Sequence, residues 1–529
     1  MDFLTLVLLI LLSVISTCVL VLGRNSWYKR SSAKLPPGPF SIPIIGNLLQ
    51  LGKNPHHSLT KLSKVCGPIM HLKLGSIHTI VVSSPEMAQE ILQKNDQVCS
   101  GRAVPSVAQA MNHHKASILW LPVGTKWRKL RKICKEQMST IHHLDAKNCL
   151  GKLQDYLQEC SNRGRAVDIC EIGFKTSLNL LSSTFFSVDL AHLNSSSTQE
   201  MMEKVQVLIK NLGTPNLADY IPLVKLIDPQ GLKHKTEVSL RRLLEILDGT
   251  LNPRFQSRGI STGSPRKKDL LEALLDFNQE DDSDFSLDDI KHLLIHALAV
   301  PDSNHGGFTD SSHGGFTDSS HGGVTGGVHG GLGAADTITD SVQWTMAELL
   351  RNPEKMSKVK DELSSIIAEN KQVEESDISR LSYLNAVIKE TFRCHPAVPF
   401  LIPHKAETDI TINGYIIPKN AQILVNVWAI GRDSRIWSNP DSFEPERFLD
   451  GKIDYKGHDF ELITFGSGRR ICPGMLLAHL MVHLMVATLI HNFNWKLEPG
   501  IEPEQLDMNE MYGISLHKAV PLKAFPVKH

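Results

Sequence analysis

The sequence predicts a mainly α-helical fold with a minor β part, in a single large domain. Segments whose apolar residues recur at helical spacing outnumber the strand-like ones, and strand-like alternation is confined to two short regions. Hydrophobic residues make up 41% of the chain, which is enough for a sizeable core. Lys+Arg and Asp+Glu number 56 each, so the balance of charge argues against a nucleic-acid partner.

The first segment of the chain is a candidate membrane anchor. Residues 3–22 carry no charge and are numerous enough to cross a bilayer as a helix. A cleaved signal peptide would begin with basic residues, whereas here Asp2 precedes the apolar stretch and the basic residues follow it. We expect a transmembrane anchor at 1–23, a basic and proline-rich hinge at 24–46, and a cytosolic domain at 47–529.

Apolar spacing assigns eight segments of the remaining chain to helices. The predicted helices span 58–64, 85–94, 126–138, 199–212, 235–251, 352–370, 383–395 and 475–493. Residues 71–83 are typical of a hairpin that turns at Gly75-Ser76, and 410–426 of short strands interrupted at Asn413-Gly414. Residues 258–268 and 440–474 are rich in turn-forming residues, so we expect irregular structure there.

One of the nine cysteines lies in an unusual loop. The cysteines are scattered and contain no C-x-x-C pair, as is typical of a reduced compartment. Cys472 lies in the glycine-rich segment FGSGRRICPG, beside two arginines and directly before a predicted helix. Cationic neighbours and a helix N-terminus favour thiolate over thiol, which would suit a nucleophile or a metal ligand. The alternative is a buried structural cysteine.

This loop has the pattern Phe-x-x-Gly-x-Arg-x-Cys-x-Gly and resembles the haem-binding loop of the cytochrome P-450 superfamily. The resemblance implies that Cys472 is the thiolate ligand of haem iron, a ligand that favours O–O cleavage. It also implies that Phe465 packs near the ligand and that Arg470 pairs with a haem propionate. Gly468 and Gly474 would allow the loop to lie close to the ring.

A second family motif is structural. Glu390 and Arg393 form Glu-x-x-Arg, and Arg447 follows about fifty residues later. Together they resemble the family's Glu-Arg-Arg triad, in which a carboxylate is held between two guanidiniums. We interpret the triad as support for the haem loop and not as part of catalysis. Without Arg447, the first two residues would be read as an ordinary surface pair one helical turn apart.

Two further positions match haem contacts of the family. Trp127 and Arg131 fit Trp-x-x-x-Arg, a spacing that places both on one helix face, from which both could reach a propionate. The same helix is strongly basic and is either a docking face for an acidic electron donor or a solvated face. His404 matches a position that could also contact a propionate, the alternative being a polar loop histidine.

The resemblance extends from residue 36 to residue 522 and is strongest to plant microsomal members of the geraniol-hydroxylase clade. It implies a monooxygenase of the endoplasmic reticulum membrane that inserts one atom of O2 into a small lipophilic substrate, such as a monoterpenoid. Electrons would come from NADPH through a membrane-bound reductase. A haem-thiolate isomerase or dehydratase is the alternative enzyme, and an inactive product is the third possibility.

The family's oxygen-activation pattern, Ala/Gly-Gly-x-Asp/Glu-Thr-Thr/Ser, is only partly kept. The matching stretch begins at Gly333 and supplies Asp336 and Thr337, the expected catalytic acid and hydroxyl. The family's second glycine is Ala334 here, which would narrow the oxygen groove, and the last hydroxyl is replaced by Ile338. Because an isomerase needs no proton relay, the presence of the acid and the hydroxyl favours a monooxygenase.

A glycine- and histidine-rich repeat lies just before this motif. Residues 301–333 contain 11 glycines, and the unit HGGFTDSS occurs twice in tandem. Such a composition cannot propagate a helix, since each glycine costs about 1 kcal/mol. Joining residue 300 to residue 333 would restore one helix. Residues 301–332 are therefore open to two readings. They are a loop that bulges from the helix of a working enzyme, or they are a gene-model error, a retained intron or an inactivating expansion. The periodicity of the repeat favours the second reading.

The substrate pocket is expected, by resemblance, at four segments: 102–121, 208–224, 397–402 and 512–516. Their apolar residues would suit a terpenoid or a small aromatic compound, and they would equally suit a plain core. The apolar candidates are Val398, Phe400, Leu401, Ile402 and Ile514.

Overall fold

The computed structural model describes Ser13 and residues 35–138, 143–187, 196–258, 269–278, 286–298, 334–369 and 371–528. Apart from Ser13, the predicted anchor lies outside the described residues, as do the basic half of the hinge and the repeat at 301–332. Within the described parts of the chain, no helix combines the length and the apolar character needed to cross a membrane.

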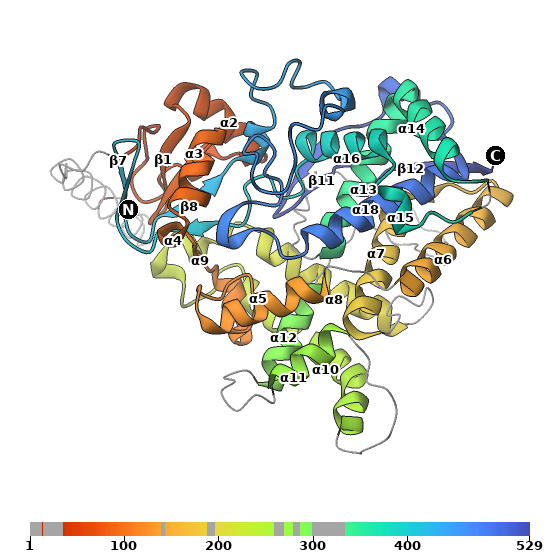
Figure 1. Ribbon diagram of the computed structural model, residues 1–529. Helices are drawn as coiled ribbons and strands as arrows, with labels where there is room; N and C mark the ends of the chain where they lie inside the picture. Colours follow the sequence, from red (N-terminus) through yellow and green to blue (C-terminus); the bar gives the residue numbers. More distant parts are fainter. Residues whose placement is uncertain are drawn as a thin grey trace, which may run out of the picture.

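Helices form most of the molecule, and a mixed five-stranded sheet lies at one end beside α2 and α3 (Figure 1). The sheet has the order β1 (Ile69–Leu74), β2 (Ile77–Val82), β8 (Gln422–Val425), β5 (His404–Lys405), β3 (Gly101–Arg102). Only β2 and β8 are parallel. The mainly α fold with a minor β part is therefore confirmed, as is the hairpin at Gly75, whose φ of 59° fits the tight turn.

The proline-rich segment that follows residue 35 lies along the free edge of β1. The amide of His71 donates to the Pro37 carbonyl at 2.9 Å, and Gly46 bridges to Leu74. A Cβ on Gly38 would come within 1.9 Å of the His71 carbonyl oxygen, so the close approach requires glycine there. The described part of the predicted hinge, 35–46, is thus packed on the sheet.

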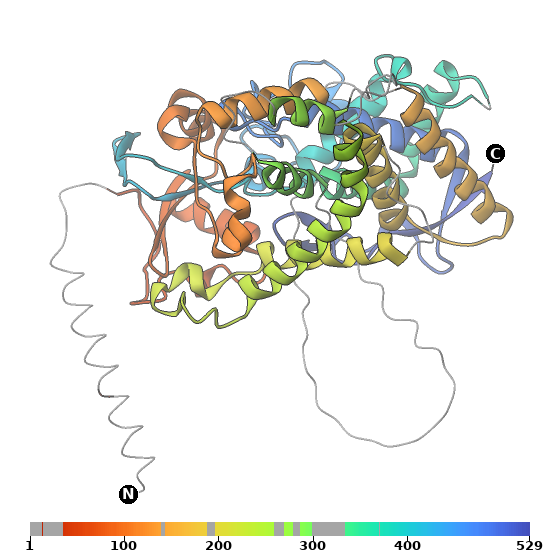
Figure 2. The ribbon, with the colours of Figure 1, turned by 90° about the horizontal axis from the view of Figure 1, so that it is seen from below.

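Most predicted helices are present with slightly shifted ends. The helices of the first half are α2 (Pro55–Cys66), α3 (Pro85–Gln89), α4 (Asp96–Cys99), α5 (Thr125–Gln137), α6 (His143–Asn162), α7 (Ile169–Phe186), α8 (Ser196–Gly213), α9 (Leu217–Tyr220) and α10 (Leu232–Arg258). Those of the second half are α11 (Leu270–Asn278), α12 (Leu287–Leu298), α13 (Ala334–Arg351), α14 (Pro353–Ile366), α15 (Glu375–Ile378), α16 (Ser382–Cys394), α17 (Val427–Ile430) and α18 (Met475–His491). Figure 2 shows the same helices from below.

The remaining regular structure is short. A π-helical turn, η2 (Glu90–Lys94), continues α3, and 3-10 turns occur at η1 (Leu48–Gln50), η3 (Ser106–Lys115), η4 (Pro222–Val224), η5 (Pro445–Phe448), η6 (Gly468–Arg470) and η7 (Pro503–Gln505). The other strands are β4 (Val167–Asp168), β6 (Ile410–Ile412), β7 (Tyr415–Ile417), β9 (Phe493–Leu497), β10 (Glu510–Tyr512), β11 (Leu516–Lys518) and β12 (Lys523–Lys528). The last predicted helix ends two residues early because Phe493 begins β9, which pairs with β12.

The core is built around α13, which packs against α7, α16 and α18. Helix α18 is apolar on all sides and is almost wholly buried, as the composition of its segment suggests. Helix α7 is also buried along nearly its whole length. Packing against these neighbours fixes the positions of α13 and of the start of α18. Both of these segments border one cavity.

Candidate active site

A cavity of about 260 Å³ lies between α13, the loop before α18 and the segment after α16. Eight of the ten predicted site residues line it: Trp127, Arg131, Thr337, His404, Phe465, Arg470, Cys472 and Gly474. Residues that are more than 300 positions apart in sequence therefore converge on one space. The cavity is otherwise mainly apolar, with Ile118, Leu119 and Val398 among the lining residues.

Cys472 lies at the end of the cavity from which α18 starts. Its amide donates to the Phe465 carbonyl at 2.9 Å, which closes the loop, and Gly474 caps α18. Burial raises the pKa of the Cys472 thiol, while the amide of Gly474 and the charge of Arg131 lower it. The sulfur therefore has one backbone donor and one cation in place to stabilise it as an anion.

Three arginines form a cluster on one side of the cavity. Arg131 donates to the carbonyl of Ile471, Arg470 to those of Ser100 and Leu121, and Arg102 to that of Ile402. Arg470 and Arg131 both lie over the ring of Trp127, at 4.9 and 5.3 Å from its centre. In the described parts of the chain, none of the three guanidiniums has a carboxylate within ion-pair distance.

Burial and mutual repulsion act together on this cluster. Both effects lower the pKa of Arg470, to about 10, and lower that of Arg102 well below its usual range. Burial lowers the pKa of Arg131 as well. One buried and two half-buried cations without a carboxylate partner make a strong site for an anionic group.

His404 completes this side of the cavity from β5. Its Nδ1 donates to the Cys99 carbonyl at 2.8 Å, which fixes the ring. Burial, with the charges of Arg102 and Arg470, holds its pKa well below the ordinary histidine value. An anion near Nε2 would raise the pKa of His404. The protonated ring could then donate hydrogen bonds from both nitrogens.

Helix α13 presents a different set of side chains to the cavity. Thr337, Ile338 and Ser341 line it, and the Ser341 hydroxyl donates to the Thr337 carbonyl at 2.7 Å. The residue at the family's last hydroxyl position is thus an apolar side chain in the cavity wall. Asp336 points elsewhere: it is buried and accepts a hydrogen bond of 2.7 Å from Ser515.

Gly468 is not among the residues that line the cavity. Its φ is +66°, and a Cβ there would lie 1.9 Å from the Leu92 carbonyl oxygen. Glycine is therefore needed because the loop presses against the turn η2, which lies behind it. Gly474 does border the cavity, and a Cβ there would meet only the Met138 sulfur, at 3.7 Å.

The predicted pocket segments contribute unequally. Val398, Leu401 and Ile402 line the cavity, whereas Phe400 packs into a separate core cluster against the sheet, and Ile514 is not in the cavity wall. Segment 102–121 contributes Arg102, Ile118 and Leu119 to the cavity wall. Segments 208–224 and 512–516 contribute no residue to it. Arg102 was missed as a charged site residue, because a lone arginine in a two-residue strand carries no sequence signal.

The Glu-Arg-Arg triad is present and buried. Arg393 donates two hydrogen bonds to Glu390, at 2.7 and 2.8 Å, and Arg447 adds a third at 3.1 Å. Arg393 also donates to the carbonyls of Gly431, Pro440 and Ser442, which ties α16 to the segment that leads to the cysteine loop. None of the three residues borders the cavity, in agreement with the predicted structural role.

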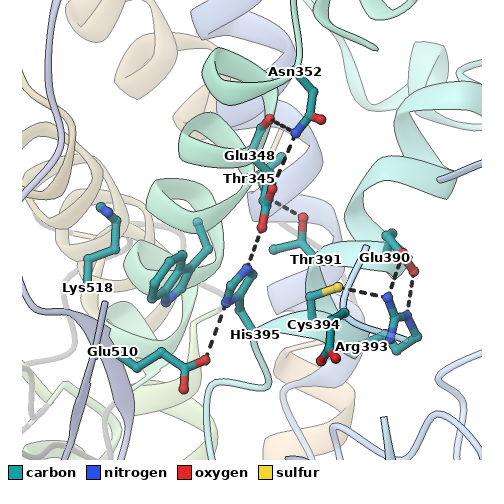
Figure 3. A network of polar contacts seen from close by, with 12 residues as sticks. Thr345, Glu348, Asn352, Glu390, Thr391, Arg393, Cys394, His395, Glu510 and Lys518 are labelled. Carbon is teal, nitrogen blue, oxygen red and sulfur yellow. Dashed lines mark hydrogen bonds and ion pairs between the residues drawn. The ribbon is translucent and has the colours of Figure 1, made fainter. Parts of the chain in front are cut away.

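A second buried network lies beside the triad (Figure 3). His395 contacts Glu348 at 2.7 Å and Glu510 at 3.6 Å, and its ring stacks on Trp344 with the centres 4.0 Å apart. Burial lowers the pKa of His395, but the two carboxylates outweigh burial and raise it overall. This network joins α13, α16 and β10 behind the cavity.

A helical fold that places a cysteine and a cluster of arginines at one cavity is typical of the haem-thiolate class of proteins. Residues 36–299 and 331–521 match the family model described as Cytochrome P450. The chain belongs to the cytochrome P450 family, whose members carry a haem-thiolate cofactor, receive electrons through a reductase and act as monooxygenases.

Several curated plant proteins are similar along nearly the whole chain. Cytochrome P450 76T24 of Catharanthus roseus is 50% identical over 96% of this chain and 95% of its own length. Ferruginol synthase 1 of Rosmarinus officinalis is 47% identical over 94% of this chain and 95% of its own length. Sugiol synthase of Salvia miltiorrhiza is 44% identical, over 96% and 97%. The resemblance to plant members is confirmed.

A solved structure of a zebrafish cytochrome P450, determined with abiraterone, has the same fold. The TM-score is 0.70, the identity is 22%, and the match covers 90% of this chain and all of that one. At this identity the likeness supports the fold alone.

Proposed function

We propose that this chain is a monooxygenase that hydroxylates a terpenoid in its apolar cavity. The single observation that carries the proposal is the wall of that cavity, to which both Cys472 and Thr337 of α13 contribute. Relatives that share 44–47% identity are named for the synthesis of ferruginol and sugiol, which are diterpenoids. A three-ring diterpenoid is therefore as good a candidate substrate as the monoterpenoid that the sequence first suggested.

The residues around the cavity fit haem. Its two carboxylates match the three guanidiniums, which have carbonyl partners but no carboxylate partner, and its flat ring matches the apolar wall. We assign Arg131, Arg470 and Arg102, with Trp127 and His404, to the propionates. Cys472 would supply the thiolate ligand, with Phe465 and Gly474 beside it in the cavity wall.

Each of these side chains has a defined task. Haem, when bound, supplies the oxygen-activating chemistry, to which the thiolate donates electron density. Burial raises the pKa of the Cys472 thiol overall, and the Gly474 amide and Arg131 oppose this effect and would stabilise the sulfur as a thiolate ligand. Thr337 lines the cavity, and Asp336, the preceding residue on α13, is the acid that we assign to proton supply. The apolar wall excludes bulk water from the substrate.

Location and chain organisation are part of the same proposal. Residues 1–23 anchor the protein in the endoplasmic reticulum membrane, 24–46 form the hinge, and 47–529 form the cytosolic catalytic domain. The family match is interrupted between residues 299 and 331, which supports the reading of 301–332 as an insertion. Whether the insertion inactivates the enzyme is decided by comparing the full chain with a chain in which residue 300 is joined to residue 333.

The test uses the full chain, produced in membranes with a plant reductase. We expect a thiolate-type Soret band on addition of carbon monoxide to the reduced protein, and NADPH-dependent oxidation of geraniol or ferruginol. Cys472→Ser is the matched control and should lose both signals. Turnover without NADPH and O2 would instead support an isomerase, and a missing Soret band in the full chain would support the inactive alternative.

A further inference from the structure

A buried polar cluster joins the C-terminal hairpin to the acid of α13. Asp336 and Asp340 are one turn apart on α13 and are only 3% and 1% exposed. His517, on β11, places Nδ1 2.8 Å from Asp340, and its Nε2 lies 3.1 Å from the Ser515 hydroxyl. Ser515 in turn donates to Asp336 at 2.7 Å. Four polar groups thus form a continuous chain that ends at the proposed catalytic acid.

The chain has one end near solvent and one end near the cavity. The side chain of His517 is 13% exposed, whereas Ser515 is fully buried. Asp336 precedes Thr337, which lines the cavity. A hydrogen-bonded path therefore runs from the partly exposed imidazole through the serine hydroxyl to this acid.

The hydrogen-bond geometry gives this path a direction. With a carboxylate at Nδ1, that nitrogen carries a proton and anchors the ring, so Nε2 is the nitrogen that exchanges protons. Its N–H donates to the Ser515 oxygen, whose own O–H donates to Asp336. When Asp336 takes the hydroxyl proton, Ser515 takes the Nε2 proton, and the neutral ring recovers a proton from water.

We propose that His517 and Ser515 resupply protons from solvent to Asp336 and are positioning residues for the oxygenation reaction. This inference deepens the proposed function and rests on it, because it assigns the protons to Asp336. Asp340 keeps the imidazole aligned, and its second oxygen has no hydrogen-bond partner among the described residues. The Asp340 carboxylate can therefore interact more strongly with the imidazole when the ring is charged.

The charges around His517 favour its protonated form at neutral pH. Burial alone would lower its pKa, but Asp340 and Asp336 outweigh burial and raise it to about 9. On the paired strand β10, Met511 lies opposite His517 and carries no charge. The neighbouring cation, Lys518, is directed away from the ring toward the Asp507 carbonyl and the face of Trp344.

The first test measures coupling in the holoenzyme, which is the amount of product formed per NADPH consumed. We compare the wild type with Ser515→Ala, Ser515→Thr, His517→Gln and His234→Gln, using reductase, NADPH and either geraniol or ferruginol. His234 is an exposed histidine on α10 and serves as the matched control. A general acid that acts directly on the reacting group raises the rate about 10²–10⁴-fold. Ser515 and His517 act through Asp336, so we expect a smaller effect, about a tenfold loss of product per NADPH in the alanine and glutamine variants. The threonine variant keeps the hydroxyl and should restore coupling.

Turnover driven by hydrogen peroxide distinguishes a role of these residues in proton supply from a purely structural role. Hydrogen peroxide carries its own protons, so peroxide-driven turnover should stay within about twofold of wild type in all variants that keep the thiolate Soret band. A parallel loss of NADPH-driven and peroxide-driven turnover would show a structural role and overturn the proposal. Full coupling in Ser515→Ala would also overturn it.

The second test does not depend on turnover. Because the folded pKa of His517 lies above its unfolded value of about 6.5, the stabilisation is fully present below pH 6.5 and is lost as pH rises through about 9. The Tm of His517→Gln should therefore fall below wild type at pH 6 and approach it by pH 10. A pH-independent difference would overturn the proposal. If the wild type oxidises neither terpenoid, the proposed function fails, and this titration still decides whether His517 holds the proton.

Discussion

Replacing Glu390 tests how much the buried triad contributes to stability. Glu390 and Arg393 are both fully buried, and the carboxylate receives three guanidinium hydrogen bonds as well as the amide of Glu444. Glu390→Gln leaves the buried guanidinium of Arg393 without its ion-pair partner, whereas Arg447 keeps its ion pair with Glu444 at 3.1 Å. Removing one partner of a buried pair costs about 3–5 kcal/mol, and we expect a loss of free energy of unfolding in this range.

The chain contains a matched control on its surface. Arg242 binds Glu200 through a similar two-bond fork, at 2.6 and 2.8 Å, but in solvent. Arg242→Gln should change stability little, because water and salt screen an exposed pair. The assay is equilibrium urea unfolding of the holoenzyme in detergent, followed by circular dichroism. Equal losses in the two variants, or a loss below about 1 kcal/mol for Glu390→Gln, would refute the reasoning.

Three further variants probe the cavity and its loop. Cys472→Ser should abolish the thiolate-type Soret band while leaving the far-ultraviolet circular dichroism unchanged, and a retained band would exclude this ligand. Gly468→Ala should destabilise the protein by more than the about 1–2 kcal/mol that its positive φ alone would cost, because its Cβ would collide with the Leu92 carbonyl. Gly414→Ala, which also has a positive φ but open space around it, is the control in the same urea assay. Arg102→Gln removes one of three crowded charges, so haem transfer to apomyoglobin should be faster while the Tm of the haem-free protein does not fall.

The cavity was largely predictable because its residues carry specific local chemistry. The loop around Cys472 combines glycine, arginine and cysteine at fixed spacing, and the helix with Trp127 and Arg131 places both on one face. Such patterns are visible without the fold. The parallel neighbours β2 and β8 lie far apart in sequence, and their pairing is visible only in the structure.

The rest required long-range contacts. Helix α7 was missed because 15 of its 18 residues are buried, so it lacks the polar face that reveals an amphipathic helix. The contact between Asp336 and Ser515 joins residues 179 positions apart, and no local pattern indicates it. Gly468 was recognised as essential to the loop, but its packing partner, Leu92, could be found only from coordinates.

The pairing of β2 with β8 has a consequence for synthesis of the chain on the ribosome. The edge of β2 that binds Gln422–Val425 is made about 340 residues before its partner. At about 5–20 residues per second, that edge waits roughly 17–70 s with its amides and carbonyls unpaired. An open strand edge is a site of aggregation, so the nascent chain depends on chaperone cover until the sheet can close. Factors that slow translation downstream of β2 should therefore lower the yield of folded protein.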